Sequence, residues 1–300
     1  MVDFAFSKPS ENISTGRIAA VDALRGLVIV LMALDHSRDF FGDMRINPLT
    51  IETTTMPLFF TRWITHFCAP TFVFLAGVSA WLFGSKQKTK FDVARFLFTR
   101  GLWLIILDFT VVHFALGFSM TALPWMFLVL SAIGVSMIML SLLCFLPARL
   151  VGAIGCLIIV THNLLDPISI EGFGFLGVAW KLIHDRPSYL PQLNLEVAYS
   201  VLPWFGVAAA GYGFAPVLRL PPENRRKVLF ATGLTLIVAF LIVRGANHYG
   251  DPNSWNWQAV SASSTADGAV TTRPNLSIAI GKTTMSFLNC INTRLHWLSC

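Results

Sequence analysis

Acid–base side chains cluster in the first apolar segment of the chain, where ionisable groups are costly and are therefore functional candidates. Arg25 and His36 lie eleven residues apart. In an α-helix this spacing points both side chains the same way, about 16 Å apart along the axis. Asp22 can pair with Arg25, and Asp39 can orient the ring of His36, because each lies three residues away. The pattern predicts a cation at one end of the helix and an imidazole base at the other. A helix start with a snorkelling arginine and an interfacial histidine fits equally well.

The second apolar segment repeats the combination of cation and imidazole. Arg62 and His66 lie four residues apart, so a helix presents them on one face. Pro70 follows four residues later and is expected to kink the helix, because proline has no N–H and its ring clashes with the preceding turn. A belt of aromatic and arginine residues at the membrane interface would give the same pattern.

Two later segments carry further candidates. His162 and Asp166 lie four residues apart, and this spacing lets a carboxylate fix the tautomer of a general base. An ordinary helix end before a proline has the same appearance. Asp108 has no charged neighbour one turn away, so it needs a partner from another helix, and His113 lies near the outer end of the same segment.

Composition assigns these residues to membrane helices. Of 300 residues, 55% are hydrophobic and only 13% are charged, which excludes a soluble globular enzyme, a disordered chain and a coiled coil. The predicted fold class is all-α, a polytopic bundle with about seven complete transmembrane helices and an incomplete eighth that begins near Thr283. The seven predicted spans are 18–40, 57–83, 95–117, 123–146, 148–165, 198–218 and 228–245.

The distribution of lysine and arginine predicts the orientation. Twelve of these residues lie in the N-terminal tail and the connections on its side, against eight spread over the longer alternate connections. The positive-inside rule then places the N-terminus in the cytoplasm and the connections 41–56, 166–197 and 246–282 outside. This orientation predicts an outward-opening polar cavity lined by His36, Asp39, Arg62, His66, Asp108, His113, His162 and Asp166. It leaves Asp22, Arg25 and Arg100 on the inner side.

Other kinds of site are not predicted. The five cysteines lack metal-ligand spacing and the outer histidines come from separate segments, so no metal is expected. Nucleotide-binding loops and hydrolase signatures are absent from the sequence. The net charge of +6 is attributed to cytoplasmic anchoring loops and not to nucleic-acid binding.

Three stretches together resemble a known family. They are Arg17-Ile-Ala-Ala-Val-Asp22-Ala-Leu-Arg25-Gly26, then Met32-Ala-Leu-Asp35-His36, then the stretch from Arg62-Trp-Ile-Thr-His66 through Pro70 to Gly77. They are similar to bacterial relatives of the heparan-α-glucosaminide N-acetyltransferase catalytic domain, over residues 17 to about 289. The spacing of Arg25 and His36 also resembles a signature of membrane O-acyltransferases.

The resemblance implies a membrane-bound acetyltransferase, a multi-pass protein of the inner (cytoplasmic) membrane. Cytoplasmic acetyl-CoA is then the co-substrate, and a sugar amine or hydroxyl of a glycan or glycolipid on the outer side is the acceptor. His36, Asp39, His66, His162 and Asp166 are the catalytic candidates. Asp22, Arg25 and Arg100 are the candidates for binding acetyl-CoA. The oligomeric state is left open.

The sequence departs from this family in two places. The lysosomal enzyme has a key histidine in the loop after its first span, but residues 37–65 contain none here, so N- and O-transfer both stay open. Residues 290–300 replace the expected continuation with Cys-Ile-Asn-Thr-Arg-Leu-His-Trp-Leu-Ser-Cys. The expected organisation is a tail over 1–16, a transmembrane domain over 17–289 and an atypical tail. A proton-coupled transporter and a truncated inactive remnant are the alternatives.

Overall fold

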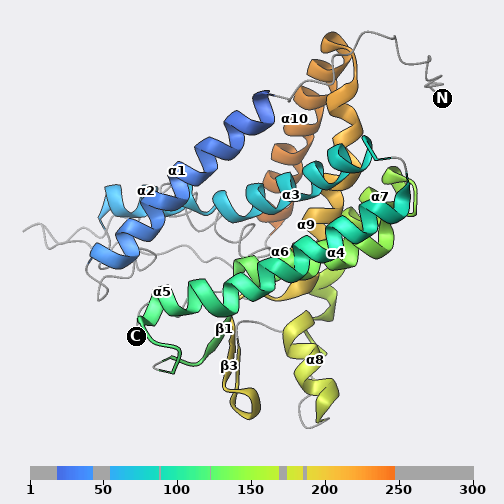
Figure 1. The fold of residues 1–300 in the computed structure, drawn as a ribbon. Coiled ribbons are helices and arrows are strands. Elements are labelled where there is room, and N and C mark those ends of the chain that lie inside the picture. Colours follow the sequence, from blue (N-terminus) through green and yellow to red (C-terminus); the bar gives the residue numbers. More distant parts are fainter. Residues whose placement is uncertain are drawn as a thin grey trace, which may run out of the picture.

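A computed structural model describes residues 19–42, 55–87, 89–121, 123–168, 174–184 and 188–246. Its first half contains α1 (Ala19–Phe41), α2 (Met56–Thr65), α3 (Cys68–Gly84), α4 (Lys90–Leu107), the π-helix η1 (Asp108–Val112), α5 (His113–Gly117) and α6 (Val129–Leu143). Its second half contains α7 (Ala148–Thr161), the 3₁₀ turn η2 (His162–Leu165), α8 (Phe175–Ile183), α9 (Val201–Phe214), the 3₁₀ turn η4 (Ala215–Arg219) and α10 (Pro222–Ala246). Figure 1 shows the helices as one bundle, with α8 on its lower side.

The membrane prediction is confirmed in its coarse form. Within the described residues, five helical segments are long and apolar enough to cross a bilayer: 57–84, 90–117, 148–165, 201–219 and 222–243. Of the other two predicted spans, 18–40 is helical from Ala19 on, whereas 123–146 is helical only over Val129–Leu143, because residues 125–127 form a β-strand. However, α1 carries several charges, and α6 has only 15 residues. The exact number of spans and the orientation stay predictions. The predicted eighth span, the connection 246–282 beyond Ala246 and the tail 290–300 lie outside the described residues.

One small sheet interrupts the otherwise helical fold. β1 (Trp125–Phe127) pairs in parallel with β3 (Leu195–Val197), and β2 (Ser188–Leu190) pairs antiparallel with β3. The turn η3 (Pro191–Leu193) joins β2 to β3 and ends at Asn194, whose φ of 46° is a left-handed conformation that asparagine tolerates. The connection 166–197 thus folds partly as α8 and this hairpin (Figure 1).

Glycines allow the helices at the centre of the bundle to pack closely against one another. Helix α9 is the most buried of the apolar spans and packs against α3 on one side and α7 on the other. At Gly77 of α3, an added Cβ would lie 1.9 Å from the carbonyl oxygen of Ala208 in α9. At Gly211 of α9, an added Cβ would lie 2.1 Å from the carbonyl oxygen of Phe74. Small residues allow this close approach of backbones, which is how membrane helices associate without a strong hydrophobic driving force.

The Gly77 contact gives a first testable prediction. We expect Gly77→Ala to lower the melting temperature of the detergent-solubilised protein, because the new methyl group overlaps the backbone of α9 and overpacking costs about 1–3 kcal/mol. Gly233→Ala is the matched control, because a Cβ built at Gly233 has no described atom within 4 Å apart from the neighbouring backbone of its own helix. Equal melting temperatures for the two variants would show that α3 and α9 do not pack this closely.

Candidate functional site

Helix α1 lies antiparallel to α2 and α3, and two polar contacts fix its register. Near the start of α1, the Arg25 guanidinium donates to the hydroxyl of Ser79 in α3 and pairs with Asp22 at 3.2 Å. Near the end of α1, the Asp35 carboxylate contacts α2. The predicted Asp22–Arg25 pair is therefore present, and Arg25 has a further partner in α3.

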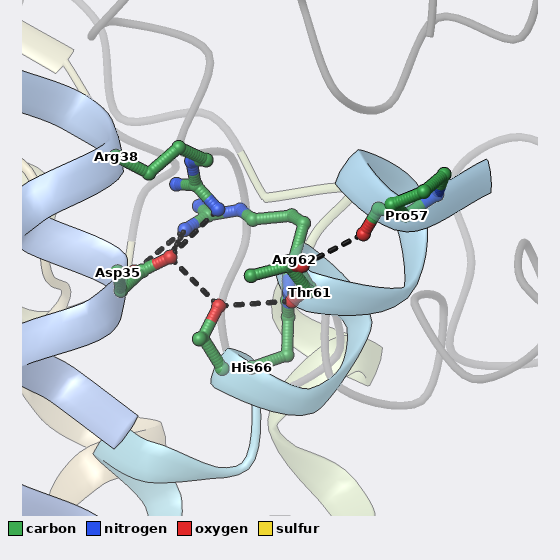
Figure 2. A network of polar contacts seen from close by, with 7 residues as sticks. Asp35, Arg38, Pro57, Thr61, Arg62 and His66 are labelled. Atoms are coloured by element: carbon green, nitrogen blue, oxygen red, sulfur yellow. Dashed lines mark hydrogen bonds and ion pairs between the residues drawn. The ribbon is translucent and has the colours of Figure 1, made fainter. Parts of the chain in front are cut away.

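Asp35 is the centre of a buried polar network between α1 and α2 (Figure 2). The Arg62 guanidinium donates to both carboxylate oxygens of Asp35, at 3.0 and 2.8 Å. The guanidinium of Arg38 pairs with the same carboxylate at 2.8 Å, and the hydroxyl of Thr65 donates to it at 2.7 Å. Only 6% of the Arg62 side chain and 17% of the Asp35 side chain are exposed. We call Asp35, Arg38, Arg62, Thr65 and His66 the Asp35 network.

A break in the apolar helix creates the place for this network. The chain ends α2 at Thr65 and begins α3 at Cys68. Pro70 accounts for the break, because it provides no N–H for the carbonyl of His66, four residues earlier, and its ring crowds that carbonyl. The expected effect of Pro70 is therefore observed as a break at residues 66–67, and this break includes His66 of the site.

At the same break, a hydrogen bond to the backbone determines the tautomer of His66. Its Nδ1 atom lies 2.6 Å from the carbonyl oxygen of Arg62, and 5% of the residue is exposed. A carbonyl oxygen can only accept, so Nδ1 carries the proton and Nε2 of the neutral ring keeps its lone pair. The Arg62 carbonyl also accepts from the Thr65 hydroxyl at 3.0 Å, which ties the ring to the network. His66 is thus held in the tautomer that a general base acting through Nε2 requires.

The network carries more positive than negative charge. Two guanidinium groups, from Arg38 and Arg62, surround the one carboxylate of Asp35. All three side chains are less than one fifth exposed, so screening by water is weak. Such a surplus of positive charge favours an arriving group that develops negative charge, such as the carbonyl oxygen of an acyl group under attack.

Two other predicted residues lie apart from these contacts. His36 follows Asp35 but is exposed, and the side chain of Asp39 lies outside the described residues. Arg100 is exposed and stacks over the ring of Phe96 at 5.5 Å, which suits an anchor at the membrane boundary. Among the described residues, no polar partner of His36 supports its predicted catalytic role, and none of Arg100 supports its predicted role in binding acetyl-CoA.

His162 and Asp166 belong to a different cluster from the one expected. Asp166 pairs with His184 at 3.2 Å, while Nδ1 of His162 contacts the carbonyl oxygens of Ile158 and Ile159 at 3.1 Å. The expectation assumed an α-helix, but residues 162–165 form a 3₁₀ turn, in which residues four apart do not share a face. By their described contacts, the predicted residues belong to three groups: the Asp35 network, the His162–His184 cluster, and a cluster around Asp108 and His113. A single cavity lined by all of them stays a prediction.

Sequence reasoning overlooked several residues of these groups. Asp35 was quoted within the family resemblance but was given no role, and the same is true of Thr65. The signal that could have identified Asp35 is its position three residues before Arg38, the spacing that pairs side chains on a helix. His184 gives no such signal, because its partner lies 18 residues earlier in the chain.

Comparison with known proteins agrees with this architecture. A family model described as heparan-alpha-glucosaminide N-acetyltransferase, catalytic, matches residues 17–248. The chain belongs to this family, which is of the membrane acetyltransferase type. No curated protein and no solved structure gives a significant match.

Proposed function

We propose that this chain is a membrane acetyltransferase that moves an acetyl group from acetyl-CoA to a sugar amine or hydroxyl. Family membership supports the reaction class. The Asp35 network is the observation that supports a place for this reaction in the fold. In it, a buried histidine with a fixed tautomer is hydrogen-bonded to the backbone carbonyl of Arg62, and the guanidinium groups of Arg62 and Arg38 both pair with Asp35. Acyl transfer needs these two functions, a base for the acceptor's proton and positive charge for the carbonyl oxygen.

His66 is the proposed general base. Nε2 takes the proton from the acceptor's amine or hydroxyl while that nitrogen or oxygen bonds to the acetyl carbonyl carbon. The carbon–sulfur bond then breaks, and the thiolate of CoA takes up the proton that His66 has held. In this assignment the Arg62 carbonyl orients the ring, and the guanidinium groups of Arg38 and Arg62 stabilise the oxyanion of the transition state.

Acetyl-CoA is proposed to approach from the Arg25 end of α1. Arg25 is 34% exposed and is held by Asp22 and Ser79, so its guanidinium stays close to the surface at that end. Arg25 and Asp35 are ten residues apart, or about 15 Å of helix rise. An extended donor can therefore span from a cationic end to the network. We place this end in the cytoplasm and the acceptor on the outer side of a bacterial-type inner membrane.

The test is acetyl transfer by the purified protein in liposomes. We expect labelled acetyl-CoA to acetylate glucosamine or another amino sugar, hydroxyl sugar or glycolipid acceptor, with protein-free liposomes as the control. Mass spectrometry of the product distinguishes N- from O-acetylation. Failure to label any acceptor, with the protein shown to be inserted and folded, would contradict the proposal.

A further inference from the structure

The three-stranded sheet has two faces of different character. β3 lies between β1 and β2, and successive side chains of a strand point to opposite faces. On one face, Leu195 and Val197 of β3 are 8% and 0% exposed and belong to the hydrophobic core. On the other face, Glu196 is in register with Tyr189 of β2 and Met126 of β1. The core therefore fixes the sheet from one side, and the face with Glu196 points away from the core.

Tyr189 gives this outer face a rigid aromatic surface. The residue is 49% exposed, and its hydroxyl donates to the side-chain oxygen of Asn194 at 2.7 Å. Asn194 is itself held in the left-handed turn that joins η3 to β3. A ring that is already held by its hydroxyl loses little freedom when a ligand covers it, which lowers the entropic cost of binding.

Glu196 places a negative charge beside this ring. Glu196 and Tyr189 lie directly opposite each other in the antiparallel pair, so their side chains are neighbours on one face. Met126, the partner of Glu196 on the other side, is neutral. Burial raises the pKa of the Glu196 carboxyl, and among the described residues no cation offsets this effect. The carboxylate therefore favours a ligand that brings positive charge or hydrogen-bond donors.

A ring, an amide and a carboxylate in this arrangement suit a sugar. One face of a pyranose consists of C–H groups, whose slight positive charge fits the negative face of an aromatic ring. Sugar hydroxyls donate and accept, so the Asn194 amide and the Glu196 carboxylate are complementary to them. A protonated amine on the sugar adds a charge-assisted hydrogen bond to the carboxylate, which is about twice as strong as a neutral one. An amino sugar thus uses all three side chains.

We propose that the exposed sheet face, defined by Tyr189, Asn194 and Glu196, binds an amino-sugar unit of the acceptor glycan. This inference rests on the proposed function, because the predicted orientation puts the connection 166–197 on the acceptor's side. Figure 1 shows the sheet at the lower side of the bundle, away from α1 and α2, which carry the Asp35 network. The unit bound here is then a different one from the unit that receives the acetyl group, and the acceptor is a glycan chain of several sugars.

Binding of a short oligosaccharide tests the inference without acetyl-CoA. The probe is the trimer of glucosamine, titrated into the full-length protein in lipid nanodiscs and followed by saturation-transfer NMR. We expect Tyr189→Ala to weaken binding about 3- to 10-fold, because it removes the aromatic contact. Phe175→Ala is the matched control, because Phe175 is 83% exposed but lies on α8, outside the exposed sheet face. No binding to the wild type, or equal binding to Tyr189→Ala, would overturn the proposal.

The charge of the sugar gives a second measurement on the same sample. We expect the N-acetylated trimer, which has no free amine, to bind more weakly than the glucosamine trimer, and Glu196→Gln to remove this difference. Equally tight binding of the two trimers to the wild type would contradict the assignment to an amino sugar. Neither measurement depends on transfer, so a protein that binds the trimer and transfers no acetyl group would contradict only the proposed function.

Discussion

Replacing His66 with glutamine is expected to lower kcat for acetyl transfer by about two to four orders of magnitude. Glutamine keeps a polar side chain beside the Arg62 carbonyl but provides no base, so the acceptor's proton has no place to go. We expect KM for acetyl-CoA to change little, because His66 is not proposed to bind the donor. Initial rates in liposomes at several acetyl-CoA concentrations separate the two parameters.

A smaller variant tests whether the imidazole itself is needed. His66→Gly removes the ring at the helix break, and added imidazole is then expected to restore part of the activity. The melting temperatures of both variants serve as the control for folding. Full activity of folded His66→Gln would rule out His66 as the base.

Replacing Asp35 with alanine is expected to destabilise the protein most among single changes at the site. The guanidinium groups of Arg62 and Arg38, whose side chains are 6% and 14% exposed, would both lose their shared carboxylate. Removing one partner of a buried ion pair costs about 3–5 kcal/mol, because the remaining charge stays buried without compensation. We expect a large fall in melting temperature and loss of acetyl transfer.

Asp22→Ala is the matched control for this change. Asp22 is also an aspartate of α1 paired with an arginine, but its side chain is 41% exposed, and surface pairs contribute about 0–1 kcal/mol. Asp35→Asn is expected to fall between the two, because it keeps an acceptor for Thr65 and loses the charge. Similar melting temperatures for Asp35→Ala and Asp22→Ala would show that the Asp35 network does not hold α1 against α2.

Local sequence signals predicted the parts of this molecule that depend on local forces. The apolar segments became helices, Pro70 broke the second one, and the pair at Asp22 and Arg25 formed, because each needs only neighbouring residues. Family resemblance, confirmed over residues 17–248, supplied the reaction class that these local signals could not.

Features that depend on long-range contacts escaped prediction. The pairing of β1 with β3 joins residues 70 positions apart, and the capping of α6 by Asp108 depends on a π-turn that no periodicity reveals. His162 and Asp166 were grouped by a spacing that holds only in an α-helix, and the 3₁₀ turn removed its basis. Asp35 and His36 are neighbours in the sequence, but Asp35 contacts α2 whereas the side chain of His36 is exposed. This difference depends on the position of α2, which the sequence pattern does not give.

The most direct test of the account compares His66→Gln with His36→Gln in one acetyl-transfer assay. Both histidines lie close to the Asp35 carboxylate in sequence or in space, but only His66 is buried and held in one tautomer. The account predicts that His66→Gln loses at least about two orders of magnitude in kcat. It predicts that His36→Gln keeps most of the wild-type rate. Loss of transfer in His36→Gln, with His66→Gln fully active, would move the base to α1 and contradict the assignment made here.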